Sequence, residues 1–275
     1  VKKGIDVIIQ AVKDFFKWLF SFFTGKKEIA ERKAVTLQLT IEKHGVSTGE
    51  IPYPANLGDV YNKPGVPANN LSWMSGAMDD CSKAIKRVEA YIEATTKACL
   101  EISKINITQH IKDDSTSDAM KGVADSLLTE SQKALGIEKL NAGSTLYGRV
   151  DIQMDTHGKL KELPDPPSPG KDPKFRTDQT QVTALLKKLK ELLAEADGML
   201  ESAMSVEQVS LKSLNSALEF AKQLDMSDSK KFTTVSNEIQ TIIRNVMANL
   251  KLLQTIVYRT IIASTSILTA TVKKG

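Results

Sequence analysis

Apolar residues recur at alternating intervals of three and four through a long central stretch of this chain. The series comprises Leu71, Met74, Met78, Cys81, Ile85, Val88, Ile92, Thr95, Cys99 and Ile102. Such sustained spacing buries one stripe of a helix against neighbouring helices in an antiparallel bundle or a coiled coil. The fold class is therefore predicted to be mainly α: an elongated antiparallel helical bundle with long helices and Pro/Gly-rich extended connectors.

Two further long helices are predicted in the last hundred residues. The first, Thr180–Leu224, carries the stripe Val182, Leu185, Leu189, Leu192, Ala196, Met199, Ala203, Val206, Ser210, Leu214, Leu218 and Ala221. The last carries Phe232, Val235, Ile239, Ile242, Val246, Leu250, Leu253, Val257 and Ile261. The polar segment Asp225–Ser229 separates the two helices, and helices joined by a short turn are expected to pack antiparallel.

The remaining segments are shorter. A basic break at Gly25–Lys27 is expected to separate an N-terminal helix from a second helix that starts near Glu28, and helix is favoured over strand for residues 34–44. Another helix should span Ser117–Leu135, with Gly136 as its stop. Alternation of Val150, Ile152 and Met154 predicts a small hairpin. The predicted organisation is a 1–27 amphipathic aromatic-basic anchor helix, a 28–69 helix and extended connector, a 70–163 helical segment with a small hairpin, a 164–176 Pro-rich linker, and a 177–275 long helical hairpin.

The N-terminal segment combines aromatic residues with lysines. At helical spacing one face carries Ile5, Ile8, Ile9, Val12, Phe16, Leu19, Phe20 and Phe23, and polar residues lie opposite. Such a face must be buried against the rest of the chain, a partner or a lipid surface. The candidate partner-docking residues are Phe15, Phe16, Trp18, Leu19, Phe20, Phe22, Phe23, Lys13, Lys17, Lys26 and Lys27.

Nothing in the sequence indicates an enzyme. His44, His110 and His157 are scattered, and the spacings typical of zinc sites and of phosphate-binding glycine loops are absent from the sequence. We therefore predict no catalytic residue, no cofactor and no metal. A formal charge of +4 is too mild for a dedicated nucleic-acid binder. Cys81 and Cys99 should be buried free thiols, because eighteen residues of continuous helix would hold them about 27 Å apart.

The C-terminal run from Leu252 to Val272 carries a single charge, Arg259, and is long enough to span a bilayer. Its many Ser and Thr residues make it only mildly apolar, and an arginine at its centre costs about 2.5 to 3.5 kcal/mol on insertion scales. A helix that is buried on most sides within a bundle explains the same composition.

Four features together resemble the internal head proteins of phiKZ-like giant bacteriophages: the helix Asp14–Lys27 (DFFKWLFSFFTGKK), the charged segment Glu28–Lys33 (EIAERK), the phrase Ile51–Pro67 (IPYPANLGDVYNKPGVP), and the C-terminal helix around Tyr258. The resemblance is one of pattern and order across most of the chain. The Thr/Ser-rich final helix departs from it.

The resemblance implies a non-enzymatic structural protein of the virion, located inside the capsid. It also implies an N-terminal propeptide that a prohead protease removes after a Glu, and the start at Val1 agrees with such trimming. The implied partners are the capsid shell or other head proteins, with non-specific contact to packaged DNA. The alternative from another class is a membrane-active helical bundle, a pore former or peripheral lipid binder, whose N-terminal helix lies among lipid headgroups.

Overall fold

The computed structural model describes residues 2–54, 69–105, 109, 113, 115–147, 150–163, 174–221 and 229–273. This part of the chain is mainly helical, as the stripes predicted. The helices are α1 (Lys2–His44), α3 (Ser72–Lys104), α5 (Thr116–Leu135), α6 (Gln179–Ala221) and α7 (Ser229–Ala270). The strands are short: β1 (Ile51–Pro52), β2 (Gly143–Tyr147), β3 (Val150–Met154), β4 (Leu160–Glu162) and β5 (Lys174–Phe175).

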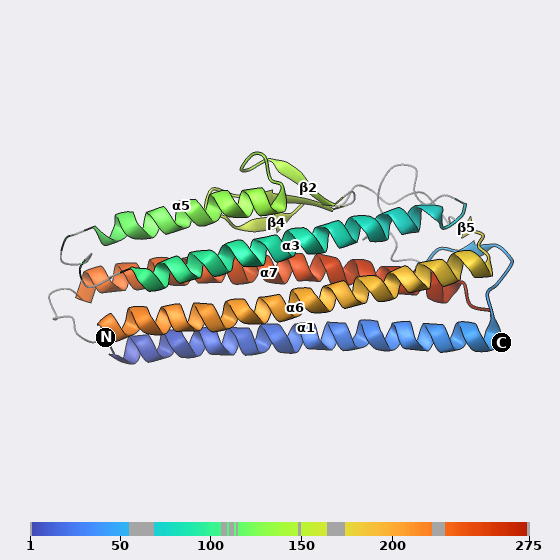
Figure 1. The fold of residues 1–275 in the computed structure, drawn as a ribbon, viewed down its shortest axis with the longest axis horizontal. Coiled ribbons are helices and arrows are strands. Elements are labelled where there is room, and N and C mark those ends of the chain that lie inside the picture. Colours follow the sequence, from blue (N-terminus) through green and yellow to red (C-terminus); the bar gives the residue numbers. More distant parts are fainter. Residues whose placement is uncertain are drawn as a thin grey trace.

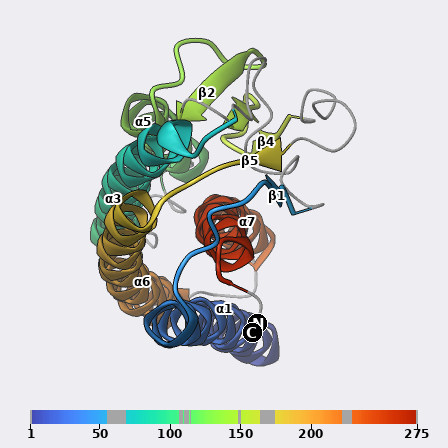
Figure 2. The ribbon, with the colours of Figure 1, turned by 90° about the vertical axis from the view of Figure 1, so that its right-hand side faces the viewer.

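Helices α1, α3, α6 and α7 lie side by side along the longest dimension of the molecule (Figure 1). In the end view, α3, α6 and α1 form a curved layer, and α7 lies on its concave side (Figure 2). Helices α1, α5 and α7 run in one direction, and α3 and α6 run in the other (Figure 1). The neighbours α3 and α6 are therefore parallel, so the chain must return between them, and α5 makes that return.

Helix α1 runs without interruption from Lys2 to His44. The predicted break at Gly25–Lys27 is therefore wrong, and with it the boundary between residues 27 and 28. A glycine inside a helix costs only about 1 kcal/mol relative to alanine. Packing of the later turns against α6 and α7 outweighs that cost, because a whole stripe is buried there: Ala30, Ala34, Leu37 and Ile41. The preference for helix over strand in residues 34–44 is confirmed.

The central stripe forms the middle of the hydrophobic core. All ten of its residues, from Leu71 to Ile102, are buried. They pack among α5, α6 and α7, which surround α3. Cys81 and Cys99 are buried free thiols, as predicted. The hydroxyl of Thr95, the most polar group in the stripe, donates to the carbonyl oxygen of Ile92 at 2.8 Å, so its burial leaves no unsatisfied donor.

The predicted stripes of the last two helices are also buried where the structure describes them. In α6 these residues are Val182, Leu185, Leu189, Leu192, Ala196 and Met199, and in α7 they are Val235, Ile239, Val246, Leu250, Leu253, Val257 and Ile261. Ile242 is half-buried. The predicted turn lies largely within residues 222–228, which are outside the described residues, as are the side chains of Ala203, Val206, Ser210, Leu214, Leu218, Ala221 and Phe232.

Helix α5 ends as the sequence predicted. Gly136 follows Leu135 in the left-handed conformation, with φ of 68°, and its N–H points back to the carbonyls of Gln132 and Lys133. This geometry satisfies carbonyl groups that the last turn of a helix leaves free, and glycine adopts it without steric cost. The residues expected to face inward, such as Val123 and Leu127, are half-buried, because α5 lies on the outside of the bundle.

The predicted hairpin is present and belongs to a larger sheet. Strands β2, β3 and β4 form an antiparallel sheet in that order. Val150, Ile152 and Met154 point to its buried face, as their alternation predicted. In the turn between β3 and β4, the Asp155 carboxylate accepts hydrogen bonds from the backbone N–H groups of His157 and Lys159.

A second pairing joins two segments that the sequence assigned to connectors. Strand β1 pairs antiparallel with β5, with Ile51 opposite Phe175. The C-terminal end of the predicted 164–176 linker is therefore strand, whereas residues 55–68 and 164–173 lie outside the described residues. The ring of Tyr53 lies 4.4 Å from that of Phe175 between centroids, and its hydroxyl accepts a hydrogen bond from the Trp73 indole at 3.1 Å. These rings fasten both connectors to the start of α3.

Helix α7 is the most enclosed helix of the bundle, although it contains many polar residues. The hydroxyls of Thr260 and Thr265 are buried and donate to carbonyls one turn earlier. Within the described residues, the stretch Thr233–Ala270 is long and apolar enough to cross a membrane, with a mean hydropathy of 1.2 in a window that is 61% buried inside the protein. A core helix has the same properties, so this composition is weak evidence for membrane insertion.

A buried side-chain amide connects α7 to both α3 and the sheet. Asn249 is 1% exposed, and its Nδ2 donates to the Tyr91 hydroxyl at 2.9 Å and to the Gly158 carbonyl at 2.7 Å. Its Oδ1 accepts from the Leu160 N–H at 2.8 Å. A second link joins the hydroxyls of Tyr147 and Thr260 at 2.6 Å. These bonds fix the sheet at one position along α7.

Candidate partner-docking surface

The predicted docking residues all lie on one continuous helix, in the N-terminal part of α1. Lys13 and Lys17 are exposed, as are the neighbouring Asp14 and Ser21. Steps of three and four connect these positions, so they form one polar strip along the outside of the helix. The apolar side chains of the prediction lie outside the described residues: Phe15, Phe16, Trp18, Leu19, Phe20, Phe22 and Phe23. Their contacts therefore stay a prediction.

Lys27 faces its own chain. Its Nζ lies 3.0 Å from the carboxylate of Asp197 on α6 and 3.9 Å from that of Glu31. The hydrogen bond to Asp197 raises the pKa of Lys27 above its usual value, with further attraction from the same carboxylate and from Glu31. Lys27 thus joins α1 to α6, and its charge is directed at the bundle.

Lys26 points to the other side of the helix, towards α7. Its side chain is half-buried, and burial lowers its pKa, as does repulsion from Arg259 and Lys251 on α7. Arg259 in turn forms an ion pair with Glu162 at the end of β4. Lys26 therefore belongs to a group of cations at the boundary between α1 and α7.

Helical periodicity divides the aromatic segment into two parts. Continued towards the N-terminus, the buried stripe of α1 reaches the positions of Phe23, Leu19 and Phe16. Other aromatic residues, at positions 15, 18 and 22, have the helical phase of Ile29, which is 40% exposed, and of Lys33, which is exposed. Periodicity thus predicts that the first group packs on the bundle and that the second faces outward.

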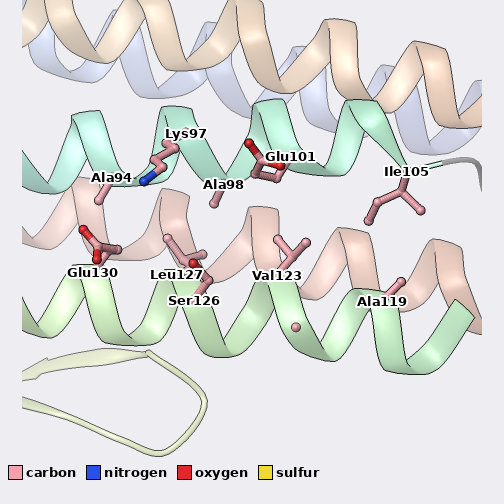
Figure 3. A pocket seen from close by; sticks show the side chains of 11 residues that line it. Ala94, Lys97, Ala98, Glu101, Ile105, Ala119, Val123, Ser126, Leu127 and Glu130 are labelled. Carbon is pink, nitrogen blue, oxygen red and sulfur yellow. The ribbon is translucent and has the colours of Figure 1, made fainter.

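A groove of about 400 Å³ runs between α3 and α5 (Figure 3). Small and apolar residues form much of its wall, among them Ala98 from α3 and Val123 from α5. Lys97, Glu101 and Glu130 add charges of both signs. This groove can accept apolar side chains, but it presents no set of groups suited to acid–base chemistry.

A wider cleft of about 670 Å³ lies between α5, α7 and the turn after β3. His157 lines it, with Nδ1 at 3.1 Å from the Thr156 hydroxyl, and Lys121 and Glu238 line it as well. His44 lies on a different element, at the end of α1, and His110 is outside the described residues. Among the residues that the structure describes, no group of three or more His, Cys, Asp or Glu side chains could hold a metal ion.

A third groove, of about 440 Å³, lies between α1 and α7. Its lining combines two cations with several hydroxyls and an apolar floor: Arg32, Lys33, Thr36, Leu37, Thr40, Ser266, Thr269 and Val272. Sequence reasoning missed this groove, because its walls come from opposite ends of the chain. One signal was present: after Glu238 the sequence contains no acidic residue.

No protein-family model matches the chain, and no curated protein or solved structure matches it. The resemblance to phage internal head proteins therefore rests on the sequence features alone. Function has to be argued from the chemistry of the surfaces described above.

Proposed function

We propose that the protein is a non-enzymatic structural component of a bacteriophage head. In this proposal it lies inside the capsid and docks on the shell or on other head proteins through the N-terminal part of α1. The long helices form an elongated, largely antiparallel bundle, with the Pro/Gly-rich connectors at its ends. Such a rod presents one helix along its whole side, which suits docking on an extended surface.

The observation that carries the proposal is the position of the aromatic segment. Helix α1 forms one edge of the curved layer, so one side of it has no neighbouring helix among the described elements (Figure 2). Lys13 and Lys17 are exposed on this helix. Periodicity places Phe15, Trp18 and Phe22 on its outward flank, where rings of this size would each contribute about 1.5 to 3 kcal/mol if buried by a partner. Part of that sum offsets the entropy of association.

The test is incorporation of a triple variant, Phe15→Ala, Trp18→Ala and Phe22→Ala, into phage heads during infection. Deletion of the segment is unsuitable, because α1 continues into the bundle. The matched control removes exposed apolar side chains from the same helix: Ile29→Ala, Val35→Ala and Leu39→Ala, which are 40%, 57% and 61% exposed in the wild-type protein. Thermal melting followed by circular dichroism verifies that both variants are folded.

We expect the aromatic variant to be absent from purified heads and the control variant to be present at the wild-type level. Incorporation of both variants at the wild-type level would refute docking through this segment. Flotation with liposomes decides the alternative. If the wild-type protein floats, the aromatic variant does not, and neither enters heads, the protein is a membrane-binding bundle instead.

A further inference from the structure

Cations from both ends of the chain converge along the boundary between α1 and α7. Helix α1 contributes Lys26, Arg32 and Lys33, and α7 contributes Lys251 and Arg259. The repulsion that Arg259 and Lys251 exert on Lys26 is strong enough to lower its pKa, which shows that their positive fields overlap across the boundary. A bound anion would relieve this repulsion.

Acidic groups offset this charge only locally. Glu162 on β4 pairs with Arg259, and the neighbouring Glu28 is exposed at a different helical phase from Lys33. The described lining of the α1–α7 groove contains no carboxylate. Helix α7 can supply none along this boundary, because the sequence after Glu238 has no acidic residue. The surface is therefore basic although the whole chain has a formal charge of only +4.

We propose that the groove between α1 and α7 binds the phosphate backbone of double-stranded DNA without regard to sequence. Arg32 and Lys33 are exposed on its wall, and a guanidinium offers paired donors to phosphate oxygens. The hydroxyls of Thr40, Ser266 and Thr269 already donate to carbonyls of their own helices. The cations are therefore the main donors for a phosphate, and side chains arranged to read base edges are not part of this lining.

The shape of the groove favours DNA over a lipid surface. A helix that lies in a membrane needs a protruding apolar face. Here Leu37 is recessed at the floor and only 2% exposed, while the charged side chains form the wall. A hollow with cationic walls receives a ridge of phosphates. This inference goes beyond the proposed docking role and does not depend on it, because it uses different residues.

The experiment compares two triple variants of the full chain that lose the same formal charge. The groove variant is Lys26→Gln, Arg32→Gln and Lys33→Gln. The control is Lys83→Gln, Lys104→Gln and Lys187→Gln, on α3 and α6, where these side chains are 71%, 68% and 81% exposed. Binding to a fluorescent random-sequence duplex is measured by anisotropy at several salt concentrations. Binding to phosphatidylserine–phosphatidylcholine vesicles is measured in parallel.

We expect the wild-type protein to bind the duplex, and the slope of log K against log salt to fall by about 0.9 for each phosphate contact that the groove variant loses. The control should keep both the affinity and the slope close to wild type. An equal loss in both variants would overturn the proposal, since it would show a general charge effect. Absence of DNA binding by the wild-type protein would overturn it too, as would loss of vesicle binding alone. If the groove variant does not fold, the exposed single variant Arg32→Gln replaces it under the same criteria.

Discussion

Replacement of Asn249 by alanine should loosen the sheet from α7. The Asn249 side chain makes three hydrogen bonds, to Tyr91, Gly158 and Leu160, and it is 1% exposed. Alanine removes all three bonds and leaves a small cavity. Two of the lost partners are backbone groups that cannot turn to solvent without movement of the strand turn.

The expected cost follows from these bonds. Each contributes about 0.5 to 1.5 kcal/mol net, so their loss lowers the free energy of unfolding by about 3 kcal/mol, before any cavity term. Tyr91→Phe removes only one of the three and should cost about 1 kcal/mol. In the double variant the two effects should overlap by about 1 kcal/mol, because they share that bond.

Urea denaturation followed by circular dichroism measures these differences in the free energy of unfolding. Hydrogen exchange adds a local measurement. The Leu160 N–H donates to Asn249, whereas the Leu163 N–H donates to the Asp151 carbonyl at 2.9 Å and serves as the internal control. In Asn249→Ala the Leu160 amide should exchange faster by a larger factor than the Leu163 amide.

The reasoning would be refuted by a loss below about 1 kcal/mol in Asn249→Ala, since a buried donor and acceptor cannot be left unpaired so cheaply. Strict additivity of Asn249→Ala and Tyr91→Phe would also contradict it. Equal acceleration of the Leu160 and Leu163 amides would show that the amide stabilises the whole bundle and has no special role at the turn.

Three other predictions concern stability and reactivity. Gly136→Ala should destabilise the protein by about 1 to 2 kcal/mol, because alanine is strained at φ of 68° and its Cβ would lie 3.3 Å from Arg87 Cζ, whereas Gly122→Ala, in an exposed helical turn with open space, should stabilise it by about 0.5 to 1 kcal/mol; thermal melts that rank the two variants in the opposite order would disprove this. Gln254→Met should stabilise the protein by about 1 to 3 kcal/mol in urea titrations, because both amide atoms of Gln254 are buried without a hydrogen-bond partner among the described residues, and a loss of stability would mean that the amide has a partner. Burial raises the pKa of the Cys81 thiol from 9.0 to about 12, so its contribution to stability is present below pH 9 and is lost as pH rises towards 12; native protein at pH 8 should resist thiol alkylation, and rapid labelling of Cys81 would contradict its burial.

The sequence predicted those elements whose residues carry a long, regular pattern. The ten-residue stripe of α3, the stripes of α6 and α7 and the glycine stop of α5 are all in place, because burial of one helix face imposes a periodicity that can be read without a structure. It failed at Gly25 and at Lys174–Phe175. A single glycine is a weak local signal that packing outweighs, and a two-residue strand has no pattern of its own.

The candidate sites divide in the same way. The exposed positions of Lys13 and Lys17 follow from helical phase, and the sequence was sufficient for them. The attachment of Lys27 to Asp197 and the convergence of Lys26 with Arg259 could not be predicted, because each joins residues more than 150 positions apart in the sequence. The sequence by itself determined that this chain forms long helices and which face of each is apolar, since both are properties of consecutive residues. Only the tertiary structure decided which helices became neighbours and therefore which charges share a groove, because those distances depend on how the rods pack.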